Sequence, residues 1–196
     1  YTTERSAHDN LAREGIAAER AFFVGNVMID SLLANRAQAA DPRQTLARGK
    51  VDLSTFDLGG GYGVVTLHRP SNVDEAATLG PLLDVLRHLS ERLPLVFALH
   101  PRTRNNVERF GLAPLVDSPR IAMLPPQGYL EMLGMLSSAH LVLTDSGGIQ
   151  EETTALDVPC LTMRENTERP ITVEEGTNTL VGRSLSRSMQ CVDDIL

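Results

Sequence analysis

The sequence predicts an α/β fold of the doubly wound, Rossmann-like type, in which helices cover both faces of a parallel sheet. Short apolar runs recur along residues 63–163, and each run ends in polar residues. Segments with apolar residues at helical spacing separate these runs, and the links between them are short. Continuous apolar strands are typical of a sheet buried on both faces. Strand–helix alternation with short links favours right-handed crossovers between parallel strands.

The first part of the chain is expected to hold two helices, one strand and a linker. Residues 3–14 fit a helix that stops at a glycine. Residues 21–24 are apolar and predict a short buried strand, after which Asn26 is a suitable N-cap for the second helix. Residues 41–61 contain a proline and three adjacent glycines, which predicts a flexible linker.

The rest of the chain, from residue 62 onwards, predicts the sheet itself, with apolar strands joined by amphipathic helices. A further, weaker strand is expected near residues 178–181. The expected strands are residues 63–67, 95–99, 121–124, 141–144 and 159–163, and the expected helices are residues 74–92, 103–110, 128–138 and 147–156.

Composition excludes several classes of protein. Of the 196 residues, 42% are hydrophobic and 22% are charged, as is usual for globular domains. The 18 basic residues are outnumbered by 25 acidic ones, so nucleic acid is not an expected partner. No apolar run is long enough to span a bilayer, and no signal peptide is expected. With two cysteines, Cys160 and Cys191, we expect reduced thiols, no metal, no cofactor and a cytoplasmic location.

The most informative stretch is residues 144–152, where a strand leads through small residues into a helix. The first amides of a helix have no partner within it and carry partial positive charge. Residues 146–148 are therefore expected to bind a phosphate or diphosphate, although an ordinary helix cap is the alternative. Glu152 returns to the same helix face and can accept both hydroxyl hydrogens of a ribose, whereas Glu151 is expected to be solvated or structural.

Other polar residues follow the expected strands, at the edge of the sheet where ligands bind. His68 with Arg69 can donate to phosphate, and His68 could transfer a proton, although a structural histidine is the alternative. His100 is expected to shape the end of its strand. The charged loop at residues 164–170 suits a ligand that is anionic and rich in hydroxyl groups, or is simply solvated. No histidine or cysteine pair has the spacing of a metal site.

Together these segments resemble the non-hydrolysing UDP-N-acetylglucosamine 2-epimerases. This family interconverts UDP-N-acetylglucosamine and UDP-N-acetylmannosamine by elimination and re-addition of UDP. The resemblance implies one half of a GT-B-type fold with two domains, and a UDP-sugar in the cleft between them. The matching segments are Val65 to Arg69 with Asn72, His100 to Arg102, Pro126-Gln127 with Tyr129, Thr144 to Glu152, Arg164 to Pro170, and Glu175 to Asn178.

The resemblance also implies roles for individual residues. His68 and Arg169 would face the phosphates and the sugar and take part in catalysis. Ser71 and Ile171 replace glutamates that are common in the family, which leaves the exact sugar open. The residues implied to bind the nucleotide are His68, Gln127, Met132, Ser146, Gly147, Gly148, Glu152 and Arg169.

The family places its proton-transfer lysine and carboxylates in an amino-terminal domain that this sequence does not contain. We therefore expect a fragment that binds UDP weakly and does not epimerise the UDP-sugar. Residues 1–25 would belong to the preceding domain and the crossover, residues 26–61 to a helix and linker, and residues 62–196 to a UDP-binding domain whose closing helix is cut short. The full-length protein is expected to be a homodimer in polysaccharide biosynthesis. A GT-B glycosyltransferase domain and a non-catalytic sugar-nucleotide-binding module are the alternatives.

Overall fold

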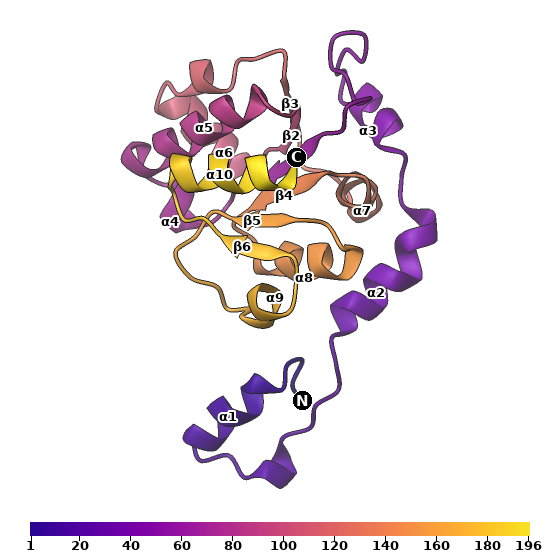
Figure 1. The fold of residues 1–196 in the computed structure, drawn as a ribbon, viewed down its shortest axis with the longest axis vertical. Helices are drawn as coiled ribbons and strands as arrows, with labels where there is room; N and C mark the ends of the chain where they lie inside the picture. The colour runs from indigo at the N-terminus through magenta and orange to yellow at the C-terminus, as the bar shows by residue number, and fades with distance from the viewer.

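The computed structural model, which describes residues 1–196, is built around a parallel sheet of six strands with helices on both faces (Figure 1). The strand order is β3-β2-β1-β4-β5-β6, so the order reverses between β1 and β4. This is the arrangement of a doubly wound fold, and it confirms the predicted class. The strands are β1 (Gly63–Thr66), β2 (Leu95–Ala98), β3 (Ile121–Leu124), β4 (Leu141–Thr144), β5 (Cys160–Thr162) and β6 (Asn178–Leu180).

Ten α-helices accompany the sheet, and none is both long and apolar enough to span a lipid bilayer. The helices expected from the apolar spacing are present within a few residues of their predicted ends, and the weak strand near residue 178 is β6. The helices are α1 (Ser6–Arg13), α2 (Val27–Asn35), α3 (Pro42–Arg48), α4 (Pro70–Val73), α5 (Ala76–Ser90), α6 (Pro101–Arg109), α7 (Tyr129–Ser137), α8 (Gly147–Leu156), α9 (Ile171–Glu174) and α10 (Leu185–Ile195).

Successive residues of each strand serve two separate hydrophobic cores. Val64 and Val65 are both fully buried, but they point to opposite faces of the sheet. The Val65 side packs with the leucines of α5, including Leu82 and Leu86. The Val64 side packs with α7 and with the segment that precedes β1. Burial on both faces is why the strands are continuous apolar runs rather than alternating ones.

The expected flexible linker at residues 41–61 is largely structured. Asp41 caps α3 by accepting a hydrogen bond from the amide of Arg43, and a proline occupies the first helical position. Leu46 is fully buried, and Phe56 is 3% exposed in the same core. The three adjacent glycines predicted flexibility, whereas Asp41 and Pro42 are the residues that start a helix. Of those glycines, Gly61 makes the turn into β1 with a φ of +88°.

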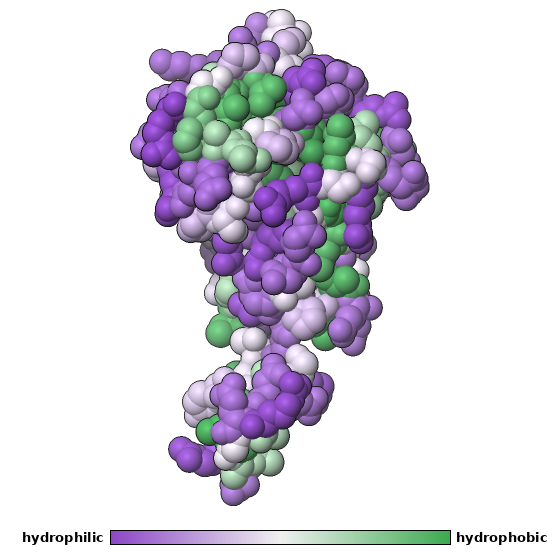
Figure 2. All heavy atoms as spheres, turned by 90° about the vertical axis from the view of Figure 1, so that its left-hand side faces the viewer, coloured by the Kyte–Doolittle hydropathy of each residue, from purple (hydrophilic) through white to green (hydrophobic).

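The expected buried strand at residues 21–24 was wrong. One isolated bridge joins Thr2 to Phe23, and the side chains of Phe22 and Val24 are 55% and 56% exposed. No sheet lies beside this segment to cover it, because the N-terminal residues form a small lobe away from the main body (Figures 1 and 2). Asn26 does cap α2 as expected, accepting a hydrogen bond from the amide of Met28.

A glycine substitution tests whether the segment before β1 is packed against the sheet. Gly134 of α7 lies against Ala40, and an added Cβ would be 1.8 Å from the Ala40 carbonyl oxygen. Because backbone atoms cannot yield, we expect Gly134→Ala to lower the free energy of unfolding by about 2–3 kcal/mol. Urea denaturation measures this change.

The matched control is Gly80→Ala in α5, where the nearest atom to an added Cβ is 3.7 Å away. We expect this variant to be unchanged or more stable by up to about 1 kcal/mol, because alanine has the higher helix propensity. Equal stability of the two variants would contradict the close packing of residues 39–40 on α7.

Candidate functional site

The site lies where β1 and β4 end, at the point where the strand order reverses. Thr66 pairs with Thr144 in the parallel register, and their hydroxyl oxygens are 2.7 Å apart. The chain therefore leaves β1 through His68 directly beside the turn from β4 into α8. Crevices at such switch points are the usual ligand sites of doubly wound sheets.

Asp145, the residue after β4, is the centre of this edge. Its side chain is fully buried and accepts hydrogen bonds from the backbone amides of His68, at 3.1 Å, and Arg69, at 2.9 Å. The side-chain amide of Asn72 donates to the same carboxylate at 3.1 Å. The Nδ1 atom of His68 lies 3.0 Å from Asp145 Oδ1. Asp145 follows an expected strand, but its role cannot be predicted from the sequence, because its partners follow a different strand.

A pocket of about 180 Å³ opens beside these residues. It brings together four residues singled out from the sequence, His68, Gln127, Met132 and Ser146. His100 also lines it, with its ring centroid 6.0 Å from that of His68. The segments that meet here come from the ends of β1, β2, β3 and β4, as expected for a ligand site at the carboxyl edge.

The start of α8 borders this pocket through Ser146 and Ile149, whereas Gly147 and Gly148 do not line it. Ser146 is the N-cap, and its hydroxyl makes no capping hydrogen bond with the helix. Gly147 and Gly148 are the first two helical residues, so their amides are among those that a helix leaves without internal partners. The free hydroxyl and the positive end of the helix dipole make this terminus suitable for a phosphate group.

Glu152 lies one turn into α8 and is half-buried. Burial raises the pKa of Glu152, and the charge of Glu151 adds to that effect. The pKa of Tyr129, at the start of α7, is also raised, first by burial and then by the charge of Glu152. The charge of Glu152 therefore acts on Tyr129 of α7, the helix that also carries Met132.

Arg169 does not line the His68 pocket. Its Nε atom lies 3.2 Å from Glu151, which is 6% exposed and also accepts a hydrogen bond of 2.8 Å from Asn26. Glu151 is therefore structural rather than solvated. Burial raises the pKa of Glu151, and the opposite charge of Arg169 offsets part of that rise. Arg169 lines a different hollow, which it shares with residues 3–10 of the N-terminal lobe.

Glu168 lies beside the first residue of α8 and is paired with two arginines. Glu168 accepts hydrogen bonds from Arg69 at 2.5 Å and from Arg164 at 2.6 Å. Partial burial raises the pKa of Glu168, but its backbone hydrogen bond and Arg164 outweigh this and lower it overall. A Cβ added to Gly147 would be 2.6 Å from a Glu168 oxygen, so glycine leaves room for this carboxylate at the helix start.

Gln150 holds the charged loop at residues 164–170 in place and was missed in the sequence. Its side chain is fully buried, and its Oε1 accepts hydrogen bonds from Thr167 at 2.6 Å and Asn178 at 3.1 Å. Asn178 in turn accepts a hydrogen bond of 2.6 Å from Thr162. A glutamine among the buried residues of a helix indicates a polar network, but its partners depend on the path of the loop.

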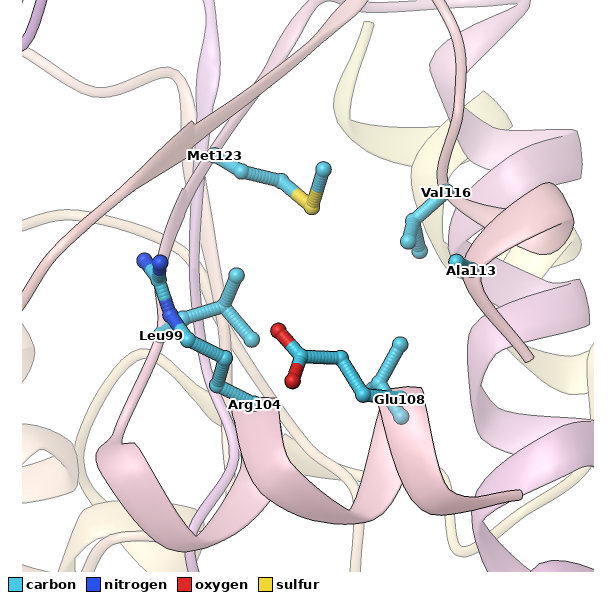
Figure 3. A pocket seen from close by; sticks show the side chains of 7 residues that line it. Leu99, Arg104, Glu108, Ala113, Val116 and Met123 are labelled. Atoms are coloured by element: carbon cyan, nitrogen blue, oxygen red, sulfur yellow. The ribbon is translucent and has the colours of Figure 1, made fainter. Parts of the chain in front are cut away.

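A third hollow, of about 260 Å³, lies between α6 and β3 and contains none of the predicted site residues (Figure 3). Five of its seven lining residues are hydrophobic, and the carboxylate of Glu108 points into it. No group of three histidine, cysteine, aspartate or glutamate side chains in the structure could hold a metal ion.

The fold is one half of a GT-B-type two-domain fold, with a pocket at the point where the strand order reverses. The sequence matches the family described as UDP-N-acetylglucosamine 2-epimerase over residues 1–196, and the chain belongs to this family.

Known relatives agree with this assignment. The UDP-N-acetylglucosamine 2-epimerase of Methanocaldococcus jannaschii is 37% identical over 193 residues, which cover 97% of this chain and 52% of the relative. The crystal structure of that enzyme in complex with UDP-GlcNAc and UDP matches with a TM-score of 0.88 at 36% identity, over 100% of this chain and 53% of that chain. A UDP-2,3-diacetamido-2,3-dideoxy-D-glucuronate 2-epimerase of Pseudomonas aeruginosa is 39% identical over 185 residues, 93% of this chain and 48% of the relative. The chain therefore spans about half the length of these relatives.

The raised pKa of Glu152 leads to a pH-dependent prediction. A carboxyl whose pKa is raised on folding stabilises the protein below its ordinary value of 4.5 and loses that contribution as the pH rises through the folded value. Glu152→Gln cannot ionise and avoids this loss. We expect the stability of the variant relative to the unsubstituted chain to increase from pH 4.5 towards neutrality, in urea denaturation at a series of pH values. A difference that is constant with pH would contradict the raised pKa.

Proposed function

We propose that this chain supplies the UDP-binding half of a UDP-N-acetylglucosamine 2-epimerase. The observation that carries the proposal is the pocket at the strand-order reversal, which joins His68, Gln127, Met132 and Ser146 in a chain that belongs to this family. The reaction would be anti elimination of UDP to give 2-acetamidoglucal, followed by return of a proton on the other face and re-addition of UDP.

The start of α8 is suited to hold UDP throughout this sequence. Elimination leaves negative charge on the diphosphate, and preorganised amides and hydroxyls stabilise such charge. In the proposal, Ser146, Gly147 and Gly148 contact the diphosphate and Glu152 accepts the ribose hydroxyls. Gln127 and Met132 would flank the uracil from the side of α7.

The two proposed catalytic residues differ in their support. His68 lines the pocket next to Ser146, within reach of a diphosphate at the helix start. Arg169 lies instead beside Glu151 and faces the N-terminal lobe. Its proposed role, contact with the phosphates and the sugar, therefore places the sugar on the side of α8 that faces this lobe.

We also propose a domain organisation for the chain. Residues 62–196 would form the nucleotide-binding domain, residues 26–61 the helical segment packed on it, and residues 1–25 part of a preceding domain. The separate N-terminal lobe and the greater length of the relatives support this division (Figure 2). The full-length protein would be a cytoplasmic homodimer that works in polysaccharide biosynthesis.

A second candidate substrate is UDP-2,3-diacetamido-2,3-dideoxy-D-glucuronate. The observation in its favour is the 39% identity to the Pseudomonas aeruginosa enzyme named for that sugar. Ser71 and Ile171, the positions that depart from the family pattern, are compatible with a changed sugar. Assaying the full-length protein with both UDP-sugars distinguishes the two substrates.

Calorimetric titration of UDP into this chain tests the binding site. We expect binding that Ser146→Asp weakens at least about tenfold, because a carboxylate at the helix start repels the diphosphate. The matched control is Ser118→Asp, far from the pocket, where the new carboxylate can still accept the hydrogen bond from the amide of Arg120. No binding to a folded chain, or equal affinity in both variants, would contradict the proposed site.

Product analysis of the full-length protein tests the reaction. We expect conversion between the two C2-epimers with UDP retained, and no turnover by the 196-residue chain. A glycosyltransferase would release UDP and form a glycoside, and a non-catalytic module would bind without any conversion. Appreciable epimerisation by the isolated chain would show that the proton chemistry does not need another domain.

A further inference from the structure

The ring of His68 is held by a carboxylate that has no contact with solvent. Asp145 is 0% exposed, and the three hydrogen bonds to it from His68, Arg69 and Asn72 fix its position on the inner side of the pocket. The Nδ1 atom of the His68 ring lies 3.0 Å from Asp145 Oδ1. The side chain of His68 is 39% exposed, so the rest of the ring faces the pocket.

This contact decides which ring nitrogen carries the hydrogen. In a neutral imidazole one nitrogen bears hydrogen and the other a lone pair. Without hydrogen, Nδ1 carries partial negative charge 3.0 Å from a buried carboxylate oxygen, and the two repel each other. The contact is an electrostatic one rather than a straight hydrogen bond. Hydrogen on Nδ1 removes the repulsion and leaves the lone pair on Nε2.

We propose that Asp145 is a positioning residue that keeps hydrogen on Nδ1 of His68, so that Nε2 is the nitrogen presented to the bound anion. A hydrogen bond from Nε2 to a phosphate oxygen of the ligand requires a ring that carries hydrogen on both nitrogens, with Nδ1 towards Asp145 and Nε2 towards the phosphate. Carboxylates beside histidine rings act in this way in other enzymes. The identity of the anion rests on the proposed function, whereas the hydrogen position on the neutral ring does not.

The hydrogen position can be measured on the unsubstituted chain. Long-range ¹H–¹⁵N correlation spectra of uniformly labelled protein distinguish ring nitrogens that carry hydrogen from those that do not. We expect the neutral His68 ring to carry hydrogen on Nδ1, and UDP to bring hydrogen to Nε2 as well. Hydrogen on Nε2 and a lone pair on Nδ1 in the ligand-free protein would overturn the proposal.

The same spectrum contains an internal control. His100 Nδ1 accepts a hydrogen bond of 3.2 Å from the amide of Arg102, so its neutral ring must carry hydrogen on Nε2. The chain has five histidines, and comparison with the spectrum of His68→Asn identifies the His68 signals. The two neighbouring rings are therefore expected to show opposite patterns.

Two substitutions of His68 separate a ligand contact from a structural one. The amide of His68→Asn can still donate to Asp145 from the Nδ1 position but has nothing at the place of Nε2. The amide of His68→Gln reaches the place of Nε2 but leaves Asp145 without the side-chain donor. We expect His68→Asn to weaken UDP binding by about tenfold, the loss of one charge-assisted hydrogen bond, and His68→Gln to weaken it less. The reverse order would overturn the proposal.

Asp145→Asn tests the carboxylate itself. If circular dichroism shows that the variant is folded, we expect the His68 ring to change its pattern, with hydrogen moving to Nε2. An unchanged pattern in a folded variant would overturn the proposal. If the variant does not fold, the spectrum of the unsubstituted chain and the two His68 variants decide the question alone. Absence of UDP binding by the unsubstituted chain would refute the proposed function and leave the hydrogen-position test intact.

Discussion

The burial of the Asp145 carboxylate is the constraint on which the rest of the site depends. An unpaired buried charge costs several kcal/mol, so its oxygens must be surrounded by donors. Here the donors come from the turn after β1, which forces that turn to fold against the end of β4. The hydrogen bonds to Asp145 also place His68 beside Ser146, and these two residues line the pocket.

Strand order explains why one carboxylate can do this. β1 and β4 are far apart in sequence but adjacent in the sheet, with Thr66 beside Thr144. The reversal of the strand order opens a crevice there, and α8 begins beside it at Ser146. On the other side of α8, fully buried Gln150 fixes the charged loop through Thr167. The helix start is therefore held between two polar networks, each anchored in the sheet.

The sequence was sufficient to predict the sheet, because apolar runs and helical spacing are local signals that the parallel core strengthens. It also placed His68, His100 and Ser146 at the pocket, since polar residues after parallel strands gather at one edge whatever the strand order, whereas Gln127 and Met132 were implied by the family resemblance. It could not assign Asp145 or Gln150 their partners, which depend on strand neighbours and on the path of a loop. The apolar segment at residues 21–24 was misassigned because burial depends on a neighbour that local sequence does not specify.

The two sides of the α8 start differ in how completely their buried polar groups are paired. On the β1 side the Asp145 oxygens all have donors. On the side of the N-terminal lobe, Glu151 Oε2 and Glu4 Oε1 are buried without a hydrogen-bond partner. An unpaired buried polar atom costs about 1–3 kcal/mol. The β1 side is therefore held in one arrangement by its paired groups. The opposite side is the one that gains stability when a bound molecule or a rearrangement of the N-terminal lobe supplies the missing partners.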